Sequence, residues 1–166
     1  MRAGAVLGRL GDRPRRFRRL INWFPAYRGT GGRVEAISDD WHRWRIRIPL
    51  SLRTRNYVGT TYGGSLYGAV DPILMLAFLK ILGPDYIVWD KAATIRFRRP
   101  GRGDLWADVR IHPEEPDAVR RLCAERSKVD RTYTIDIVDR DGIVHADVEK
   151  VLHFRRKDRE DAVHDG

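Results

Sequence analysis

The residues best suited to chemistry lie in one stretch, where two glycines open an apolar segment that contains an acid. Gly63 and Gly64 begin the segment, and Asp71 follows seven residues after Gly64. Glycines let a ligand approach the backbone closely, and the first N–H groups of a helix have no intrahelical partner. These groups can donate to an anion or to a polarised carbonyl, as in an oxyanion hole. Asp71, about two turns along the same helix, would stand in an apolar setting as a base or nucleophile.

Asp71 also has a structural interpretation, because Pro72 follows it. Aspartate is a favoured N-cap, and proline is favoured at the first helical position. On this interpretation the helix runs only over residues 72–82, and Asp71 caps it. The glycine pair is likewise compatible with an ordinary turn. The residues by themselves leave the catalytic and structural alternatives open.

The segment that carries these residues, 63–82, is apolar on nearly all sides. Such a pattern predicts a helix that is buried all round. A membrane span is the competing interpretation, but Asp71, Pro72 and Lys80 weigh against it. Gly83 and Pro84 predict the end of the helix.

Strands surround this helix in the sequence. Alternation of apolar and polar residues predicts strands over 33–38, 41–50, 86–99, 104–112, 129–139 and 143–155, with a short helix at about 115–126. One face is shared by Ala93, Ile95 and Phe97 in one strand, and by Val144, Ala146, Val148, Leu152 and Phe154 in the last. One antiparallel sheet can bury a helix by curling around it. The expected fold is therefore α+β, a curved antiparallel sheet wrapped around a long buried helix, which is the shape of the hotdog fold.

Composition limits the class of protein. The chain has 166 residues, of which five are Trp, six Tyr and five Phe, and this content predicts a folded domain. The single cysteine, Cys123, excludes a disulfide framework and a cysteine-based zinc site, so we expect a cytoplasmic protein without a metal. Of the net charge of +9, residues 1–33 supply +8, with nine Arg and one Asp. A general nucleic-acid-binding surface is therefore not expected.

The charge distribution divides the chain into a basic arm over 1–32, a hotdog domain over 33–155 and a charged tail over 156–166. Within the arm, residues 14–24 are typical of an amphipathic helix. Its apolar stripe favours docking on the sheet or on a partner subunit. Its arginines and aromatic residues leave open a peripheral contact with an anionic membrane.

The stretch from Asn56 to Asp71 resembles the hotdog-fold acyl-CoA thioesterases of the phenylacetate-pathway type. Their signature is His-Gly-Gly, three to six further residues, then Ala-Asp, and here Tyr62-Gly63-Gly64 and Val70-Asp71 stand at these places. Asn56 resembles an upstream asparagine of that family, and residues 89–104 resemble its strand after the helix. The likeness covers about residues 30–155 and is strongest to a branch of thioesterase-like proteins known only as an uncharacterised domain.

The resemblance implies a homodimer, or a dimer of dimers, that hydrolyses an acyl-CoA without a cofactor. It implies that the Gly64 N–H polarises the thioester carbonyl and that Asp71 of a second subunit activates water or attacks directly. Gly63 and Asn56 complete this catalytic set. Tyr62 in place of the histidine and Pro72 after the acid depart from the family pattern. Any role of that imidazole is therefore absent here or belongs to a phenol.

Candidate substrate contacts lie at both ends of this region. They are Tyr62, Ser65, Arg96, Arg98, Arg99 and Arg102, and the four arginines suit the phosphates of coenzyme A. A solvated strand face is the alternative for the arginines, and a first-turn position is the alternative for Ser65. Two other functions remain open: a non-catalytic acyl-CoA or lipid-binding hotdog module, and a basic adaptor whose arm binds a membrane or nucleic acid.

Overall fold

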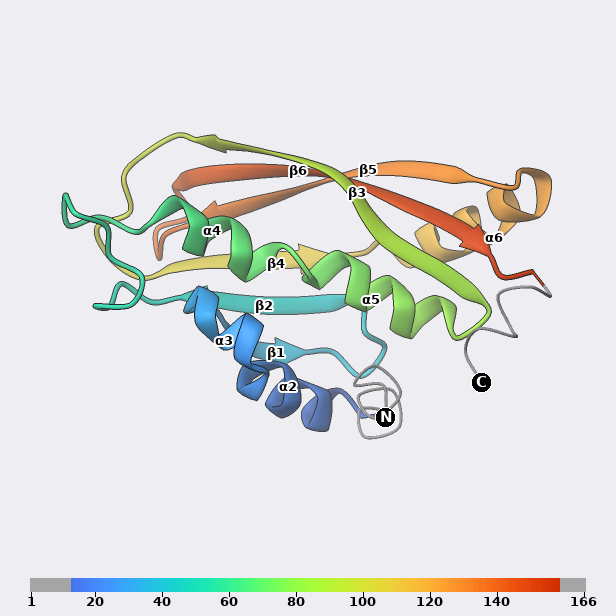
Figure 1. Ribbon diagram of the computed structural model, residues 1–166, viewed down its shortest axis with the longest axis horizontal. Coiled ribbons are helices and arrows are strands. Elements are labelled where there is room, and N and C mark those ends of the chain that lie inside the picture. The colour runs from blue at the N-terminus through green and yellow to red at the C-terminus, as the bar shows by residue number, and fades with distance from the viewer. Residues whose placement is uncertain (1–12, 159–166) are drawn as a thin grey trace.

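Residues 13–158 are described by the computed structural model of the chain (Figure 1). The helices and strands follow in the order α2 (Pro14–Trp23), α3 (Pro25–Thr30), β1 (Arg33–Ile37), β2 (Arg43–Ile48), α4 (Gly63–Val70), α5 (Ile73–Leu82), β3 (Tyr86–Phe97), β4 (Leu105–Arg110), α6 (Glu115–Glu125), β5 (Val129–Val138) and β6 (Val144–Arg156). The six predicted strands and the short helix after β4 are all present. The helix α3 is an addition to the elements that the sequence predicted.

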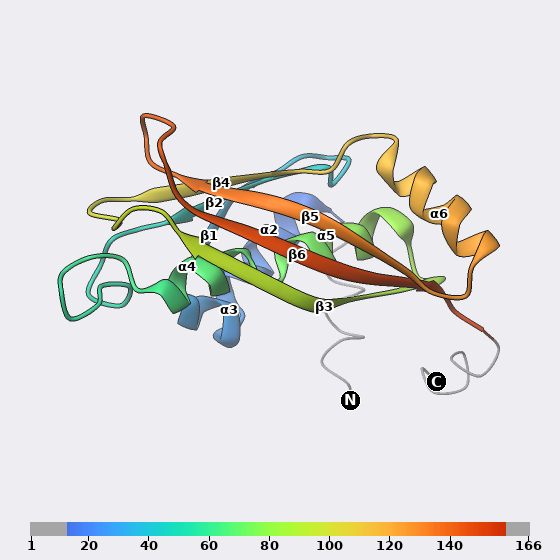
Figure 2. The same ribbon diagram turned by 90° about the horizontal axis from the view of Figure 1, so that it is seen from above.

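The sheet is antiparallel throughout, with the strand order β1-β2-β4-β5-β6-β3. It curves around α4 and α5, while α6 lies at one end, as the view from above shows (Figure 2). This arrangement confirms the predicted α+β hotdog architecture. The strands β1 and β3 form the two edges, and β3 is a long edge strand of 12 residues.

The core lies between the sheet and the central helix. Alternate residues of β4 are buried, and so are Ile46, Ile48, Val148 and Leu152, because one face of each strand turns toward the helix. Phe78 of α5 packs edge-on against Phe154 of β6, with ring centroids 4.9 Å apart. Burial of these side chains is the main stabilising contribution, at roughly 1.5–3 kcal/mol for each fully buried large apolar side chain.

The central helix is interrupted at Asp71 and Pro72. Helix α4 ends at Val70, and α5 begins at Ile73 with Pro72 as its N-cap. Proline has no N–H to donate to the preceding turn, so the helical hydrogen-bond ladder is broken there. Asp71 is therefore not the N-cap of α5, and its side chain makes no capping bond to that helix, so the N-cap interpretation is wrong.

The prediction that the central helix is buried all round is also wrong. Only half of its 18-residue apolar window is buried in this structure, although residues 63–82 are long and apolar enough to cross a membrane. One face packs on the sheet. On the other, Tyr67, Met75, Leu76 and Leu79 are only half-buried. A single chain therefore leaves an apolar face of its central helix open.

The arm packs onto the body of the protein. Phe17 and Ile21 of α2 are each only 5% exposed, as the docking interpretation predicted, whereas Trp23 is 75% exposed. Lys80 of α5 places its ammonium 5.1 Å from the centre of the Phe17 ring, and the hydroxyl of Tyr27 in α3 donates to the carbonyl of Ala69 at 3.0 Å. The arm is therefore fastened to both halves of the central helix. Residues 1–12 of the predicted arm and 159–166 of the predicted tail lie outside the described residues.

Candidate functional site

The interruption of the central helix places Asp71 against a buried ammonium group. Lys150 of β6 is 0% exposed, and its Nζ lies 2.8 Å from Asp71 Oδ1 and 2.8 Å from Asp90 Oδ1. The same ammonium donates to the backbone carbonyl of Asp71, an acceptor near the break in the helix. The contact with Asp90 is an ion pair rather than a well-directed hydrogen bond. Two carboxylates therefore share one buried cation.

The strand register explains how this cluster is assembled. In β6, Lys150 lies two residues from Val148 and two from Leu152, both of which point inward. Its side chain therefore also points toward the helix. In β3, Asp90 pairs with Leu152 and Ala93 pairs with Lys150, with a register shift between Asp90 and Ala92. Such a shift places one extra residue in the strand, so that side chains beyond it point to the opposite face from the one that strict alternation predicts. As a result, Asp90 shares the inner face with Ala93, three residues later.

Tyr67 completes the cluster from the helix side. Its hydroxyl donates to Asp71 Oδ1 at 2.6 Å, and the Lys150 ammonium lies 5.8 Å from the centre of its ring. Burial, and then the hydrogen bond to Asp71, raise the pKa of Tyr67 well above its ordinary value. The phenol therefore stays protonated at neutral pH and acts as a donor to the carboxylate. Among residues 13–158, Asp71 Oδ2 receives no comparable hydrogen bond.

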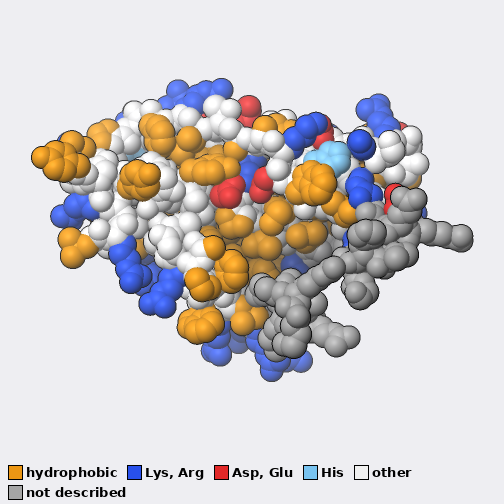
Figure 3. Space-filling view, viewed as in Figure 1, with side chains coloured by type: hydrophobic (Ala, Val, Ile, Leu, Met, Phe, Trp, Pro, Cys, Tyr) orange, Lys and Arg blue, Asp and Glu red, His pale blue; other side chains and the backbone are white. Residues whose placement is uncertain are grey.

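The cluster opens onto the uncovered face of the protein. Acidic side chains reach the surface near the middle of this face, among hydrophobic ones (Figure 3). The side chain of Asp71 is 41% exposed, in contrast to the dry setting expected for it, while Lys150 beneath it has no exposed surface. The Asp71 side chain is thus partly exposed while its Oδ1 is held by Tyr67 and Lys150.

The glycine pair forms the start of α4, as predicted. The first-turn hydrogen bonds begin with the N–H groups of Ser65 and Leu66, which both donate to the carbonyl of Tyr62. The N–H groups of Gly63 and Gly64 precede them and are the ones a helix leaves without an internal acceptor. A Cβ atom added at Gly63 would lie 2.8 Å from the Phe97 ring, and one at Gly64 would overlap the ring of Tyr62. Two exposed aromatic rings therefore flank these backbone groups.

The same helix separates Gly64 from Asp71. Seven residues at 1.5 Å each span about 10 Å along the axis. A thioester carbonyl bound at the Gly64 N–H is thus out of reach of Asp71 in the same chain. The two predicted catalytic groups are not brought together within one copy of the protein.

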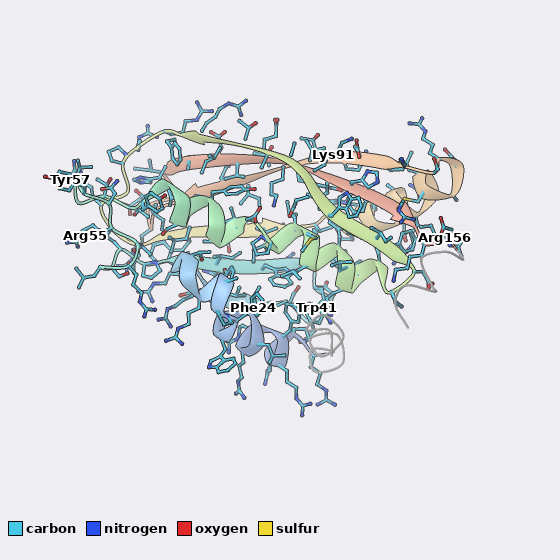
Figure 4. The ribbon with its side chains drawn as sticks, in the orientation of Figure 1. Phe24, Trp41, Arg55, Tyr57, Lys91 and Arg156 are labelled. Carbon is cyan, nitrogen blue, oxygen red and sulfur yellow. The ribbon has the colours of Figure 1, made fainter. Side chains whose placement is uncertain are left out.

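Other predicted contacts have clear local partners. Asn56 accepts a hydrogen bond from the Thr60 N–H at 3.0 Å and donates to the Thr60 hydroxyl at 2.9 Å, which closes the loop before α4. Tyr57, at the tip of this loop, points into solvent (Figure 4). Ser65 is buried in the first turn of α4, and Tyr62 is 58% exposed beside it.

The predicted arginines divide into two groups. Arg96 and Arg98 both face Asp147 of β6, and a distance of 3.5 Å separates Arg96 Nη1 from Asp147 Oδ2. Arg99 instead donates to the carbonyl of Val144 at 3.0 Å. Arg102 is exposed in the turn after β3. Half of this set therefore already has a carboxylate partner.

Sequence reasoning missed Lys150, Asp90 and Tyr67. Lys150 was detectable, because it occupies an inward position between Val148 and Leu152 and a buried lysine needs a partner. Asp90 was hidden by the register shift, since strict alternation from Ala93 assigns it to the outer face. Within residues 13–158, no group of three or more His, Cys, Asp or Glu side chains is arranged to hold a metal ion.

Replacement of Asp90 by Asn tests the charge balance of the cluster. Burial, partly opposed by Lys150, raises the pKa of Asp90 above its ordinary value of 3.8. The folded state then binds more protons than the unfolded state between these two pKa values, so stability from this group falls as pH rises. We therefore compare the unfolding free energy of Asp90→Asn with that of the unchanged protein in urea titrations at several pH values. We expect the difference, variant minus unchanged protein, to become more positive between about pH 4 and pH 7.

Asp147→Asn is the matched control for this prediction. Arg98 lowers the pKa of Asp147, so that carboxylate contributes stability that is present at neutral pH and lost in acid. Its replacement should therefore give a difference of the opposite slope. A flat or falling difference for Asp90→Asn would show that the Asp90 carboxylate is not destabilised in the fold.

Comparisons with known proteins identify the family and support the fold. The family described as Domain of unknown function (DUF4442) matches residues 14–153, and no curated protein matches the sequence. The structure is similar to PA5026 from Pseudomonas aeruginosa, a protein of unknown function described as "Probable Thioesterase", with a TM-score of 0.74 and 24% identity over 84% of this chain and 93% of that chain. It is also similar to thioesterase HI1161 from Haemophilus influenzae, with a TM-score of 0.64 and 16% identity over 86% and 90% of the two chains.

A variant of thioesterase PA1618 from Pseudomonas aeruginosa has the same architecture, with a TM-score of 0.58 and 17% identity over 77% of this chain and 84% of that chain. At these identities the likeness demonstrates the fold, which is a thioesterase-like hotdog fold. The family match extends from the first residues of α2 into the last strand. The chain therefore belongs to the DUF4442 family.

Proposed function

We propose that this protein hydrolyses the thioester of an acyl-coenzyme A. The observation that carries the proposal is Asp71, whose carboxylate is held by the fully buried Lys150 and by Tyr67 on the open face of the protein. A carboxylate that is exposed on one side and anchored on the other can accept a proton from a bound water. The hotdog neighbours described as thioesterases support the same reaction class.

In the proposed reaction, the oxygen of a water molecule forms a bond to the thioester carbon while its proton passes to Asp71 Oδ2. The carbonyl oxygen becomes an oxyanion, which accepts a hydrogen bond from the Gly64 N–H at the positive end of α4. Collapse of this intermediate breaks the carbon–sulfur bond and returns the proton to the thiolate. The products are a carboxylic acid and the free thiol of coenzyme A.

This reaction needs two copies of the chain. About 10 Å of helix separates Gly64 from Asp71 within one copy, so we propose that Gly64 of one protomer and Asp71 of its partner serve the same substrate. Two features of the single chain support a homodimer: the unpaired edge of β3 and the half-exposed apolar face of the central helix. Light scattering of the purified protein measures the assembly directly.

A panel of acyl-CoA substrates with a thiol reagent tests the activity itself. Release of free thiol supports the hydrolase. Retention of acyl-CoA without release of thiol supports instead the non-catalytic acyl-CoA or lipid-binding module.

Two substitutions at Gly64 test the proposed oxyanion contact. Gly64→Pro removes the N–H, and a first-turn position tolerates proline because this group has no intrahelical acceptor. We expect kcat to fall by about 100-fold, the usual effect of losing one oxyanion donor. Steady-state kinetics with the best acyl-CoA of the panel measures the loss.

Gly64→Ala is the matched control. It adds the same Cβ beside the Tyr62 ring, which is 58% exposed and free to turn away, but it keeps the N–H. Its kcat should stay within a few-fold of the unchanged protein. Equal losses in the two variants would mean that crowding by the Cβ, and not the missing donor, affects the site.

A further inference from the structure

A cavity of about 370 Å³ lies between the arm and the central helix. Phe17 and Ile21 of α2, Phe24 between α2 and α3, and Met75 and Leu76 of α5 supply apolar walls. Figure 4 shows Phe24 on the arm, alongside the central helix. The volume is in the range of small-molecule sites, and the walls are of the apolar kind that such sites use.

The wall of this cavity carries one charged side chain. Asp71, the candidate catalytic residue, is the one charged group among the described residues that line the cavity. The two neutral polar side chains are engaged elsewhere, because the hydroxyl of Thr30 donates to the carbonyl of Tyr27 at 2.7 Å and that of Tyr27 donates to the carbonyl of Ala69. A ligand that fills this space therefore meets mostly hydrocarbon and a single carboxylate.

The shape of the cavity depends on the arm. The contacts of Phe17 with Lys80 and with Trp41, whose ring centroid lies 5.5 Å away, hold α2 beside α5. Tyr27 holds α3 against α4. The break at Pro72 lies between these two attachments, and Pro72 itself lines the cavity. The arm thus forms an outer wall opposite the interrupted helix.

We infer that this cavity binds the aliphatic chain of the acyl thioester, so that the arm sets the acyl-chain length that the protein accepts. The inference rests on the proposed function, because it places the chain of the substrate beside Asp71, which accepts the proton of the attacking water. A neutral thioester is compatible with the Asp71 carboxylate in the wall of the cavity, whereas a carboxylate product is repelled by it. Hydrolysis therefore weakens binding of the chain and favours release of the acid.

Ala26→Trp tests the cavity without disturbing the core, because Ala26 is exposed on α3 and lines the cavity. Each methylene that can no longer be buried lowers binding about fourfold. We expect the ratio of kcat/KM for decanoyl-CoA to that for butanoyl-CoA to fall at least about tenfold. Gly29→Trp, on the same helix with open space around its Cβ and outside the cavity, should leave the ratio unchanged.

A binding measurement separates this inference from the proposed hydrolysis. The chain has two methionines, Met1 and Met75, so a methyl-labelled sample gives a reporter at the cavity wall. Decan-1-ol should shift the Met75 methyl signal in the unchanged protein and in Gly29→Trp, but not in Ala26→Trp. If this pattern holds while no acyl-CoA is hydrolysed, the cavity inference stands and the proposed reaction fails.

Two results overturn the inference. One is an equal Met75 shift with decan-1-ol in Ala26→Trp and in the unchanged protein. The other is turnover whose dependence on chain length does not respond to Ala26→Trp. Far-ultraviolet circular dichroism and the unfolding midpoint confirm that each tryptophan variant is folded.

Discussion

Asp71→Asn should lower acyl-CoA turnover by on the order of 10³-fold while leaving the protein folded. The amide is the same size as the carboxyl, can still accept the Tyr67 hydroxyl, and leaves Lys150 paired with Asp90. It cannot accept a proton from water. The loss should therefore appear in kcat, as measured by release of free thiol at saturating substrate, with little change in the unfolding midpoint.

Asp130→Asn serves as the control. Asp130 lies on the outer face of the sheet, where it pairs with Lys91 and His153, so the same change of one carboxyl should leave turnover unaltered. Lys91 is labelled in Figure 4, on the sheet and away from the arm. Normal turnover by Asp71→Asn would remove the chemical role that we assign to this residue.

The Asp71 and Gly64 variants together test whether a site is shared between two copies. When Asp71→Asn chains are mixed with Gly64→Pro chains and allowed to exchange, half of the dimers contain one of each. Each such dimer has one site with both lesions and one intact site, so the mixture should recover about a quarter of the normal rate. No recovery despite proven exchange would mean that both groups act within one chain.

Lys150→Met should reduce the unfolding free energy by about 3–5 kcal/mol. The ammonium of Lys150 has no exposed surface and contacts both Asp71 and Asp90. Methionine preserves much of the side-chain volume but removes the charge, so two carboxylates then face each other without a cation. Since small domains are stable by only about 5–15 kcal/mol, urea denaturation should detect this loss readily.

Further variants keep this prediction testable if Lys150→Met does not fold. Adding Asp90→Asn and Asp71→Asn to Lys150→Met removes the uncompensated charges and should recover much of the lost stability. Lys91→Met provides the contrast, because Lys91 is 56% exposed in its pair with Asp130 and solvent screens that pair. Similar midpoints for Lys150→Met and Lys91→Met would contradict the assigned importance of the buried ammonium.

Asp71 has two roles in the proposed reaction. Asp71 must be held by Lys150 and Tyr67 through one oxygen and remain available through the other. Its position at the break in the central helix meets both demands, because the chain there turns its carboxylate between the sheet and the open face.

Much of the architecture could be predicted from the sequence. Period-two alternation located all six strands, because each strand has one face on the core and one in solvent. The apolar segment from Gly63 to Leu82 identified the central helix, and the glycine pair identified its start. Such local patterns predict the fold well because the positions of apolar residues along each segment match the face that the folded protein buries.

The assembly of the site was decided by the tertiary structure. The register shift after Asp90 reverses the face of β3, and no local pattern predicts which strand pair absorbs an extra residue. Lys150 comes 79 residues after Asp71 in the sequence, so their contact depends on how the sheet curls around the helix. The cavity beneath the arm likewise exists only where α2 and α3 dock against α5. Sequence by itself determined which residues face inward along most strands; which of those residues meet depends on packing between segments that are distant in the chain.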